Sequence, residues 1–265
     1  MFAAISRSIL CLAVCALASA NAVADDGKEI ATDRPDFVES SDVVPKGMWQ
    51  IETSLNWERN TQQGANDRSF ATPTLLRFGF ANNLEFRIET DGRVWQRTDD
   101  GTGSVRTNGW ADTSLGLKWH FMDGKDSTPS AALLFHADLD SGSDGLRGNG
   151  IRPSIRLVAE WDLPDDMSLG IMPGLMFDKN ADGKRFTSGI FGIVVGKEWS
   201  KTFRSFVEVS LPQITGNSNG GTQANLTVGG AWLLSDNVQL DTALSRGLNK
   251  RTPSWNWTVG LSMRF

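Results

Sequence analysis

The last eleven residues, Trp255–Phe265, read WNWTVGLSMRF and alternate strictly between apolar and polar side chains. The odd positions carry six large apolar groups, whereas the even positions carry small or polar groups that include Arg264. A period of two residues is the pattern of a β-strand with one apolar and one polar face. The apolar face needs a non-aqueous neighbour, which is a second sheet in a soluble sandwich and lipid in a membrane barrel.

The C-terminal residue favours the membrane barrel. A last strand that ends in an aromatic residue, here Phe265, resembles the closing strand of bacterial outer-membrane barrels. The resemblance implies that the barrel assembly machinery recognises this strand through Phe265. It also implies that the lipid and lipopolysaccharide of the outer membrane are partners of the folded chain.

The chain is expected to begin with a signal peptide, residues 1–24. Arg7 supplies the positive charge, residues 9–18 are apolar, and residues 22–24 read AVA, a small-x-small cleavage site. Both cysteines of the chain lie within this segment. The mature chain is therefore expected to contain neither disulfides nor thiolate metal sites.

The composition limits the remaining classes. The formal net charge is -5 and becomes -6 when Arg7 leaves with the signal peptide, a mild value that argues against a nucleic-acid partner. No later segment offers about 18 consecutive apolar residues, so no transmembrane helix is expected. The 10 Trp, 14 Phe and 27 Gly suit a β protein with aromatic belts.

The mature chain is expected to have two parts, an N-terminal periplasmic segment at 25–46 and a barrel at 47–265. The first part shows no periodicity, whereas alternation begins after Gly47 and returns through the rest of the chain. Polar loops are expected at 60–69 and 98–108. The alternating stretches predict twelve strands, at about 49–58, 70–80, 84–96, 111–121, 131–139, 151–161, 167–177, 186–199, 203–213, 222–234, 238–246 and 255–265.

Two further patterns support a barrel. Short connections of about three residues alternate with longer ones, with one exception near residue 125, as in outer-membrane barrels with short periplasmic turns. Every second strand also ends in an outward aromatic residue: Phe80, Trp119, Trp161, Trp199, Trp232 and Phe265. This spacing is typical of an aromatic girdle at a membrane interface. We therefore expect an all-β, 12-stranded antiparallel transmembrane β-barrel in the bacterial outer membrane, with both termini in the periplasm.

The segment before the barrel carries a family motif. Residues 32–52, TDRPDFVESSDVVPKGMWQIE, resemble the opening of a family of bacterial outer-membrane proteins labelled "transporter" or "putative MetA-pathway of phenol degradation". Val38 departs from the pattern, which has Thr there. The resemblance implies a barrel that passes small solutes, aromatic or hydrophobic compounds among them. The matching positions are Asp33, Arg34, Pro35, Asp36, Phe37, Glu39, Ser40, Pro45, Gly47, Gln50 and Glu52.

The polar parity of the strands carries charges of both signs, which are expected to face the lumen because charges on the lipid face are costly. Two interpretations remain open: the charges pair across strands and fill the lumen, or they select the solute. Arg152 and Arg156 flank Ser154 on one face and would form a basic ladder for an anion. The expected lumen or solute path comprises Glu85, Arg87, Glu89, Arg93, Arg152, Arg156 and Glu160.

The TDRPD motif itself carries charges ahead of the first strand. Asp33, Arg34 and Asp36 are expected to fold back as a plug at the periplasmic mouth and to pair with lumen charges. The alternative is that residues 25–46 form a disordered tether. Deleting the segment and measuring conductance distinguishes the two.

No catalytic, metal or cofactor site is expected. His120 and His136 lack a third metal ligand, and the chain contains neither a G-x-S-x-G elbow nor a phosphate loop. The expected function is therefore a channel for passive passage of small solutes. The alternatives are a closed structural or adhesive barrel, separated by conductance, and a lipid-acting hydrolase, separated by fatty-acid release from phospholipid.

Overall fold

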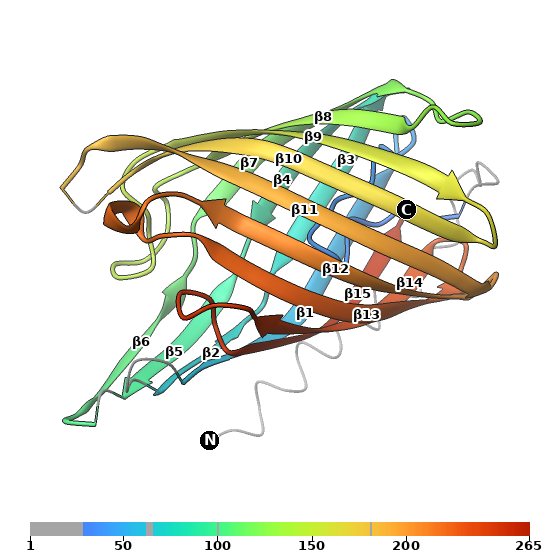
Figure 1. The fold of residues 1–265 in the computed structure, drawn as a ribbon. Helices are drawn as coiled ribbons and strands as arrows, with labels where there is room; N and C mark the ends of the chain where they lie inside the picture. The colour runs from blue at the N-terminus through green and yellow to red at the C-terminus, as the bar shows by residue number, and fades with distance from the viewer. Residues whose placement is uncertain (1–28, 62–65, 100, 181) are drawn as a thin grey trace.

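The computed structural model describes residues 29–61, 66–99, 101–180 and 182–265. The strands form one antiparallel sheet that curls until its last strand pairs with its first (Figure 1). In this closing pair Gln50 lies opposite Arg264, and Arg59 lies opposite Trp255. No helix within the described ranges is long and apolar enough to cross a membrane.

Fifteen strand segments make up the described sheet, because three barrel strands are each interrupted once. Segment β2 continues into β3, β4 into β5, and β6 into β7, which gives the twelve strands that the alternation predicted. The segments are β1 (Trp49–Asn60), β2 (Asn66–Ala71), β3 (Thr74–Ala81), β4 (Leu84–Thr90), β5 (Arg93–Asp99), β6 (Ser104–Trp110), β7 (Thr113–Met122), β8 (Ser130–Asp138), β9 (Arg152–Leu163), β10 (Met167–Lys179), β11 (Arg185–Ser200), β12 (Phe203–Ile214), β13 (Gln223–Ser235), β14 (Val238–Gly247) and β15 (Trp255–Arg264).

The two predicted loops at 60–69 and 98–108 are wrong in extent. Segment β2 begins at Asn66 and pairs with both β1 and β5, and β6 pairs with β5 along its whole length. These segments carry the sheet beyond the rest of the barrel, at the lower left of Figure 1. The sequence pattern does not reveal these segments, because alternation depends on one face of a strand being apolar. Backbone hydrogen bonds hold a hairpin together whatever the polarity of its side chains.

The interruption at Asp91 and Gly92 changes which residues face outward. In β4 the even positions face outward, whereas in β5 the odd positions Arg93 and Trp95 do so, because Trp95 contacts the outward ring of Phe70. Gly92 has a φ of 68°, a conformation that side-chain-bearing residues rarely adopt. The break in the pleat therefore moves every later residue of this strand to the opposite face.

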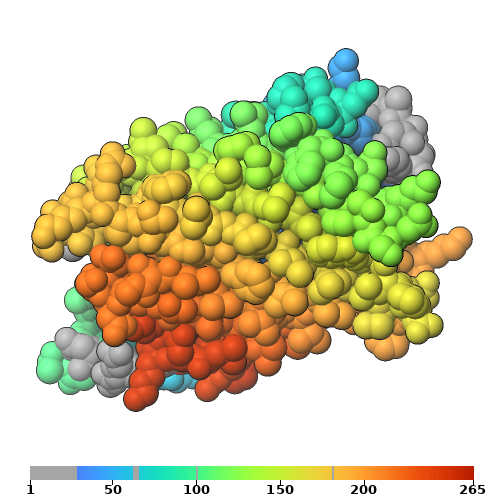
Figure 2. All heavy atoms as spheres, turned by 45° about the horizontal axis from the view of Figure 1, so that its top comes forward, coloured from blue at the N-terminus to red at the C-terminus, as the bar shows by residue number. Residues whose placement is uncertain are grey.

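The outer surface is apolar and ends in aromatic rings. Large apolar side chains such as Leu55, Leu117 and Val207 point outward and are exposed. Figure 2 shows the side chains of the strands forming a continuous wall on this face. At the end with the short turns, five of the six predicted aromatic residues are exposed, namely Phe80, Trp119, Trp199, Trp232 and Phe265, whereas Trp161 is half-buried.

The interior is occupied by the chain that precedes β1. Ile30 N–H donates to Asp236 O (2.8 Å) in the short turn between β13 and β14, and Lys46 forms a bridge to Gly79 of β3. Residues 30–44, which we call the lumen segment, enter and leave at the same end of the barrel. Figure 1 shows this segment in blue inside the ring of strands.

Candidate functional site

Four carboxylates of the barrel wall accept hydrogen bonds from the backbone of the lumen segment. They lie on four different strands, β1, β4, β9 and β12. Because the segment forms no strand inside the barrel, these carboxylates satisfy N–H groups that would otherwise be buried without partners. The donors and acceptors are Asp33 N to Glu52 (3.0 Å), Phe37 N and Val38 N to Glu208 (2.9 and 2.8 Å), Ser41 N to Glu160 (2.5 Å), and Val44 N to Glu85 (2.8 Å).

Asp33 is the most strongly held residue of the lumen segment. Its carboxylate accepts from Lys118 Nζ (2.8 Å) and from Arg87 Nη1 (2.6 Å), and Arg77 Nη1 lies at 3.4 Å. All four side chains are almost fully buried. Burial alone would raise the pKa of Asp33, but Arg77, Lys118 and Arg87 together hold that pKa well below its usual range. Asp33 therefore stays ionised inside the barrel.

The ion pairs extend from Asp33 into one network across the lumen. Arg77 Nε and Arg87 Nη1 lie 2.9 and 3.0 Å from Glu85, while Glu39 of the lumen segment binds Arg87 Nη2 (2.7 Å) and Arg156 Nη1 (2.6 Å). Such buried charges are tolerable only when their number balances. The network contains four cations, Arg77, Arg87, Lys118 and Arg156, and four carboxylates, Asp33, Glu39, Glu52 and Glu85.

The lumen segment also reaches the opposite wall. Arg34 Nη2 lies 3.3 Å from the Asp241 carboxylate on β14 and donates to Thr258 Oγ1 on β15 (2.8 Å). Asp36 lies 3.9 Å from Arg204 of β12. Burial raises the pKa of Asp36, and Arg204 only partly opposes this. The predicted plug residues Asp33, Arg34 and Asp36 thus all lie against charges of the barrel wall.

The tip of the lumen segment is apolar. Val38 is 4 % exposed and belongs to a buried apolar cluster with Ala132, Leu134, Val158, Met172, Val194, Phe206 and Ala243. Phe37 packs against this cluster. The wall is shaped to receive these side chains, because a Cβ added to Gly192 would lie 2.7 Å from Val38 Cγ2 and 3.0 Å from the Phe37 ring. Only glycine at position 192 lets the tip approach this closely.

The seven residues predicted to line the lumen do not form one site in the structure. Glu85, Arg87, Arg156 and Glu160 all contact the lumen segment. Glu89 also faces inward, 3.9 Å from His136, but its side chain remains 45 % exposed. Arg152 pairs with Asp112 (2.8 Å) and Asp138 (3.8 Å) near the long connections, away from Arg156, so the structure does not form the predicted basic ladder.

Arg93 does not line the lumen. It lies on the outer face of the protruding hairpin, where its guanidinium is 5.7 Å from the Trp95 ring centre and 5.9 Å from that of Trp110. The prediction assumed one unbroken strand and counted parity across Gly92. The break there reverses the face and turns Arg93 outward.

Three contributors to this site escaped the sequence reasoning. Glu39 bridges two arginines, and Phe37 with Val38 fills the apolar half of the lumen. Nothing in their local pattern marks an inward role, because the lumen segment has no period. The available signal was the family motif, in which Phe37 and Glu39 are both matching positions.

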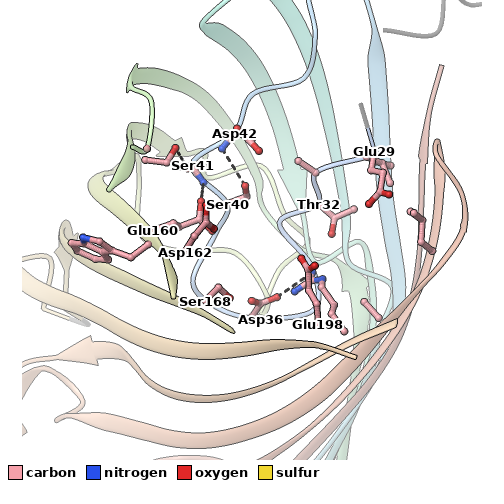
Figure 3. A pocket seen from close by; sticks show the side chains of 18 of the residues that line it. Glu29, Thr32, Asp36, Ser40, Ser41, Asp42, Glu160, Asp162, Ser168 and Glu198 are labelled. Atoms are coloured by element: carbon pink, nitrogen blue, oxygen red, sulfur yellow. Dashed lines mark hydrogen bonds and ion pairs between the residues drawn. The ribbon is translucent and has the colours of Figure 1, made fainter. Parts of the chain in front are cut away.

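A cavity of about 950 Å³ opens beside the lumen segment at the end with the short turns. Figure 3 shows Asp36, Ser41 and Glu160 along it, with Ser41 held to Glu160. The cavity is lined mainly by polar groups, several of them from the lumen segment. No group of residues suited to holding a metal ion occurs in the described part of the chain.

These features define a class of protein. A closed antiparallel barrel with an apolar outer face, aromatic rings at its edge and a charged interior is a bacterial outer-membrane β-barrel. Residues 32–265 match the model of the family described as "Putative MetA-pathway of phenol degradation", and the chain belongs to that family. No curated protein matches it in sequence.

Solved structures share the fold at low sequence identity. An outer membrane channel from Pseudomonas putida F1 aligns with a TM-score of 0.65 and 10% identity over 87% of this chain and 99% of that one. The translocator domain of the autotransporter NalP from Neisseria meningitidis aligns at 0.53 with 14% identity, over 82% and 87%. The KdgM porin in complex with oligogalacturonate aligns at 0.51 with 15% identity, over 82% and 99%.

Proposed function

We propose that the chain is an outer-membrane channel, not an enzyme, for passive passage of small solutes, and that the lumen segment closes it in this conformation. The observation that carries the proposal is how the segment is held. Side chains on both walls bind it, and it pairs with no strand between its two ends. A segment held in this way leaves the barrel intact when it withdraws, since every strand keeps its own neighbours.

Withdrawal of the segment changes the charge of the lumen. In the described structure Lys118 has Asp33 as its carboxylate partner, and Arg156 has Glu39. Both partners belong to the lumen segment, so both cations lose them when it leaves. Asp241 in turn loses Arg34, and Glu160 and Glu208 lose their N–H donors. Residues 30–44 carry four carboxylates and one arginine, a net charge of -3, so their withdrawal makes the lumen more positive, which favours anions.

The family and the fold guide the choice of solute. The family description refers to phenol degradation, and the P. putida structure is that of a channel. We therefore propose small aromatic compounds as the first class to examine, and aromatic acids in particular because of Lys118 and Arg156. Phe265, whose backbone pairs with Trp49 at 2.7 and 2.8 Å, remains the proposed signal for the barrel assembly machinery.

The test is single-channel conductance in planar bilayers. The mature chain is expected to be mostly closed, whereas the same chain without residues 29–44 is expected to show large ohmic openings. Reversal potentials in a salt gradient are expected to show anion preference in the deleted form, and benzoate is expected to permeate faster than an aromatic cation of similar size.

The control keeps the barrel and tests the alternatives. Both forms are first checked for the heat-modifiable migration of a folded barrel. A folded, deleted form that never conducts would contradict the channel and favour a closed structural barrel. Fatty-acid release from labelled phospholipid by either form would favour the hydrolase.

A further inference from the structure

A row of arginines crosses the outer face of the barrel near the long connections. Cross-strand pairing places Arg59 of β1 opposite Arg68 of β2, Arg68 opposite Arg97 of β5, and Arg97 opposite Arg106 of β6. All four side chains are exposed. On its other side Arg59 pairs with Trp255, which stacks under Arg246 at 4.6 Å. We call Arg59, Arg68, Arg97, Arg106 and Arg246 the arginine row.

The charges of the arginine row are not neutralised by the chain. No carboxylate in the described ranges lies within ion-pair distance of Arg59, Arg68 or Arg106, and Arg97 has only Asp99 at 3.9 Å. Like charges that face one another directly across strands destabilise a sheet. Three such pairs in succession therefore point to an anion that is supplied from outside the chain.

A row of aromatic rings lies one step nearer the middle of the barrel, on the same face. Trp257 stacks on Trp57 (4.9 Å), Trp57 contacts Phe70 (5.3 Å), and Phe70 contacts Trp95 (5.4 Å). On β1, Trp57 lies eight residues beyond Trp49, which is roughly 26 Å along the strand. At the usual strand tilt of about 35–45° this is about 20 Å along the barrel axis, and Arg59, two residues further on, lies about 25 Å from Trp49, which is the height of the apolar band. The arginine row therefore lies just outside the aromatic row, at the edge of the apolar band, where lipid head groups begin.

The two rows together line a shallow groove of about 780 Å³. Its lining includes four arginines and one carboxylate, Glu58. The aromatic residues of the lining are Trp57, Phe70, Trp95, Trp255 and Trp257, and the arginines are Arg59, Arg68, Arg97 and Arg106. Guanidinium groups bind phosphate through paired hydrogen bonds, and aromatic rings suit the boundary between acyl chains and a polar head group.

We propose that this groove binds the phosphorylated glycolipid of the outer leaflet, with the arginine row on its phosphates and the aromatic row along its sugars and upper acyl chains. The distance from Arg59 to Arg106 covers three strand spacings, or roughly 14 Å. That width accommodates both phosphates of a bisphosphorylated disaccharide on one row. A glycerophospholipid offers one phosphate and no sugar, so it satisfies the row less well.

The experiment measures lipid bound to the refolded full-length mature barrel by native mass spectrometry in a neutral detergent. The probes are bisphosphorylated lipid A, its monophosphorylated form and phosphatidylglycerol. The test variant is Arg59→Gln/Arg68→Gln/Arg97→Gln. The control variant, Lys184→Gln/Arg185→Gln/Lys250→Gln, removes the same charge at the same end of the barrel but outside the groove.

We expect bisphosphorylated lipid A to bind at least tenfold more tightly than either other probe, the test variant to lose at least tenfold of that affinity, and the control variant to change less than twofold. Equal binding of phosphatidylglycerol, or an equal loss in both variants, would overturn the proposal in favour of general attraction to anionic lipid. Heat-modifiable migration confirms folding. If the triple variant fails to fold, Arg68→Gln alone is measured against Lys184→Gln, with threefold as the expected loss and no loss as the contradicting result.

Discussion

The lumen segment meets its wall in two different ways. Toward β1, β3, β4 and β7 it offers Asp33, which lies within 3.4 Å of three cations. Toward the apolar cluster of β8 to β14 it offers Phe37 and Val38, which pack against small, aliphatic and aromatic side chains. One side is charged and directional, whereas the other is apolar and depends on shape.

The two sides differ in the free energy that a single substitution costs. Removing one member of a buried ion network leaves its partners unpaired in a low dielectric, at a cost of about 3–5 kcal/mol. Removing a methyl group from an apolar contact costs only about 1 kcal/mol. We therefore expect the ion network on the charged side to contribute most of the free energy that holds the lumen segment in place. Each contact on the apolar side is expected to contribute less.

Asp33→Ala is expected to produce the largest effect. The substitution leaves Lys118 without its carboxylate and removes one partner each from Arg77 and Arg87, while every barrel residue stays unchanged. A loss of about 3 kcal/mol raises the ratio of open to closed channels more than 100-fold. The open fraction in single-channel records at pH 7 measures this.

Asp36→Asn is the matched control for that prediction. Asp36 lies in the same segment, but its nearest cation, Arg204, is 3.9 Å away and its pKa is raised by burial, so the loss of its charge costs little. The open fraction is expected to change less than threefold. If the two variants opened the channel equally, the ion network around Asp33 would not be what holds the channel closed.

The apolar side is tested by a pair of substitutions at one contact. Gly192→Ala places a Cβ 2.7 Å from Val38 Cγ2 and is expected to push the tip away, with about a tenfold rise in open fraction. Val38→Ala removes two methyl groups, leaves a gap and is expected to raise the open fraction about 15-fold. The double variant is expected to open less than Gly192→Ala alone, because the new methyl group fills the gap. Additive effects would show that the two side chains do not touch in the closed channel.

The sequence predicted the wall of this site better than its contents. Strict alternation placed Glu85, Arg87, Arg156 and Glu160 on the inner face, and all four contact the lumen segment. Alternation works here because lipid on one side of each strand forces every second residue to be apolar. Alternation shows on which face of a strand a side chain lies but not which residue that side chain contacts. It therefore left open whether the charges pair with one another or select a solute.

The remaining errors have two physical causes. Parity fails wherever the pleat is broken, and Arg93 lies beyond such a break at Gly92. Periodicity is also silent for a chain that forms no regular element, which is why Glu39 and Val38 were not recognised inside the barrel. Their positions depend on contacts with β9 and β10 that lie more than 100 residues away in the chain.

The smallest effect on channel closure is expected at the end of the barrel with the long connections, where the Asp112 carboxylate holds residues 141–148. Asp112 accepts hydrogen bonds from the backbone of Gly142 and Gly148 and from Arg152, each at 2.8 Å. Burial acts to raise the pKa of Asp112, but these bonds outweigh it and hold the pKa below its usual value. Asp112 therefore stabilises residues 141–148 above the usual Asp pKa, and this contribution is lost as the pH falls through the lowered value.

Asp112→Asn is expected to accelerate hydrogen exchange of residues 141–148 about tenfold at pH 7, because its amide presents a donor to Gly148 N–H and Arg152. The open fraction is expected to stay within twofold of the unsubstituted chain, since Asp112 makes no contact with the lumen segment among the described residues. An increase in conductance as large as that of Asp33→Ala would mean that the long connections, and not the lumen segment, close the channel.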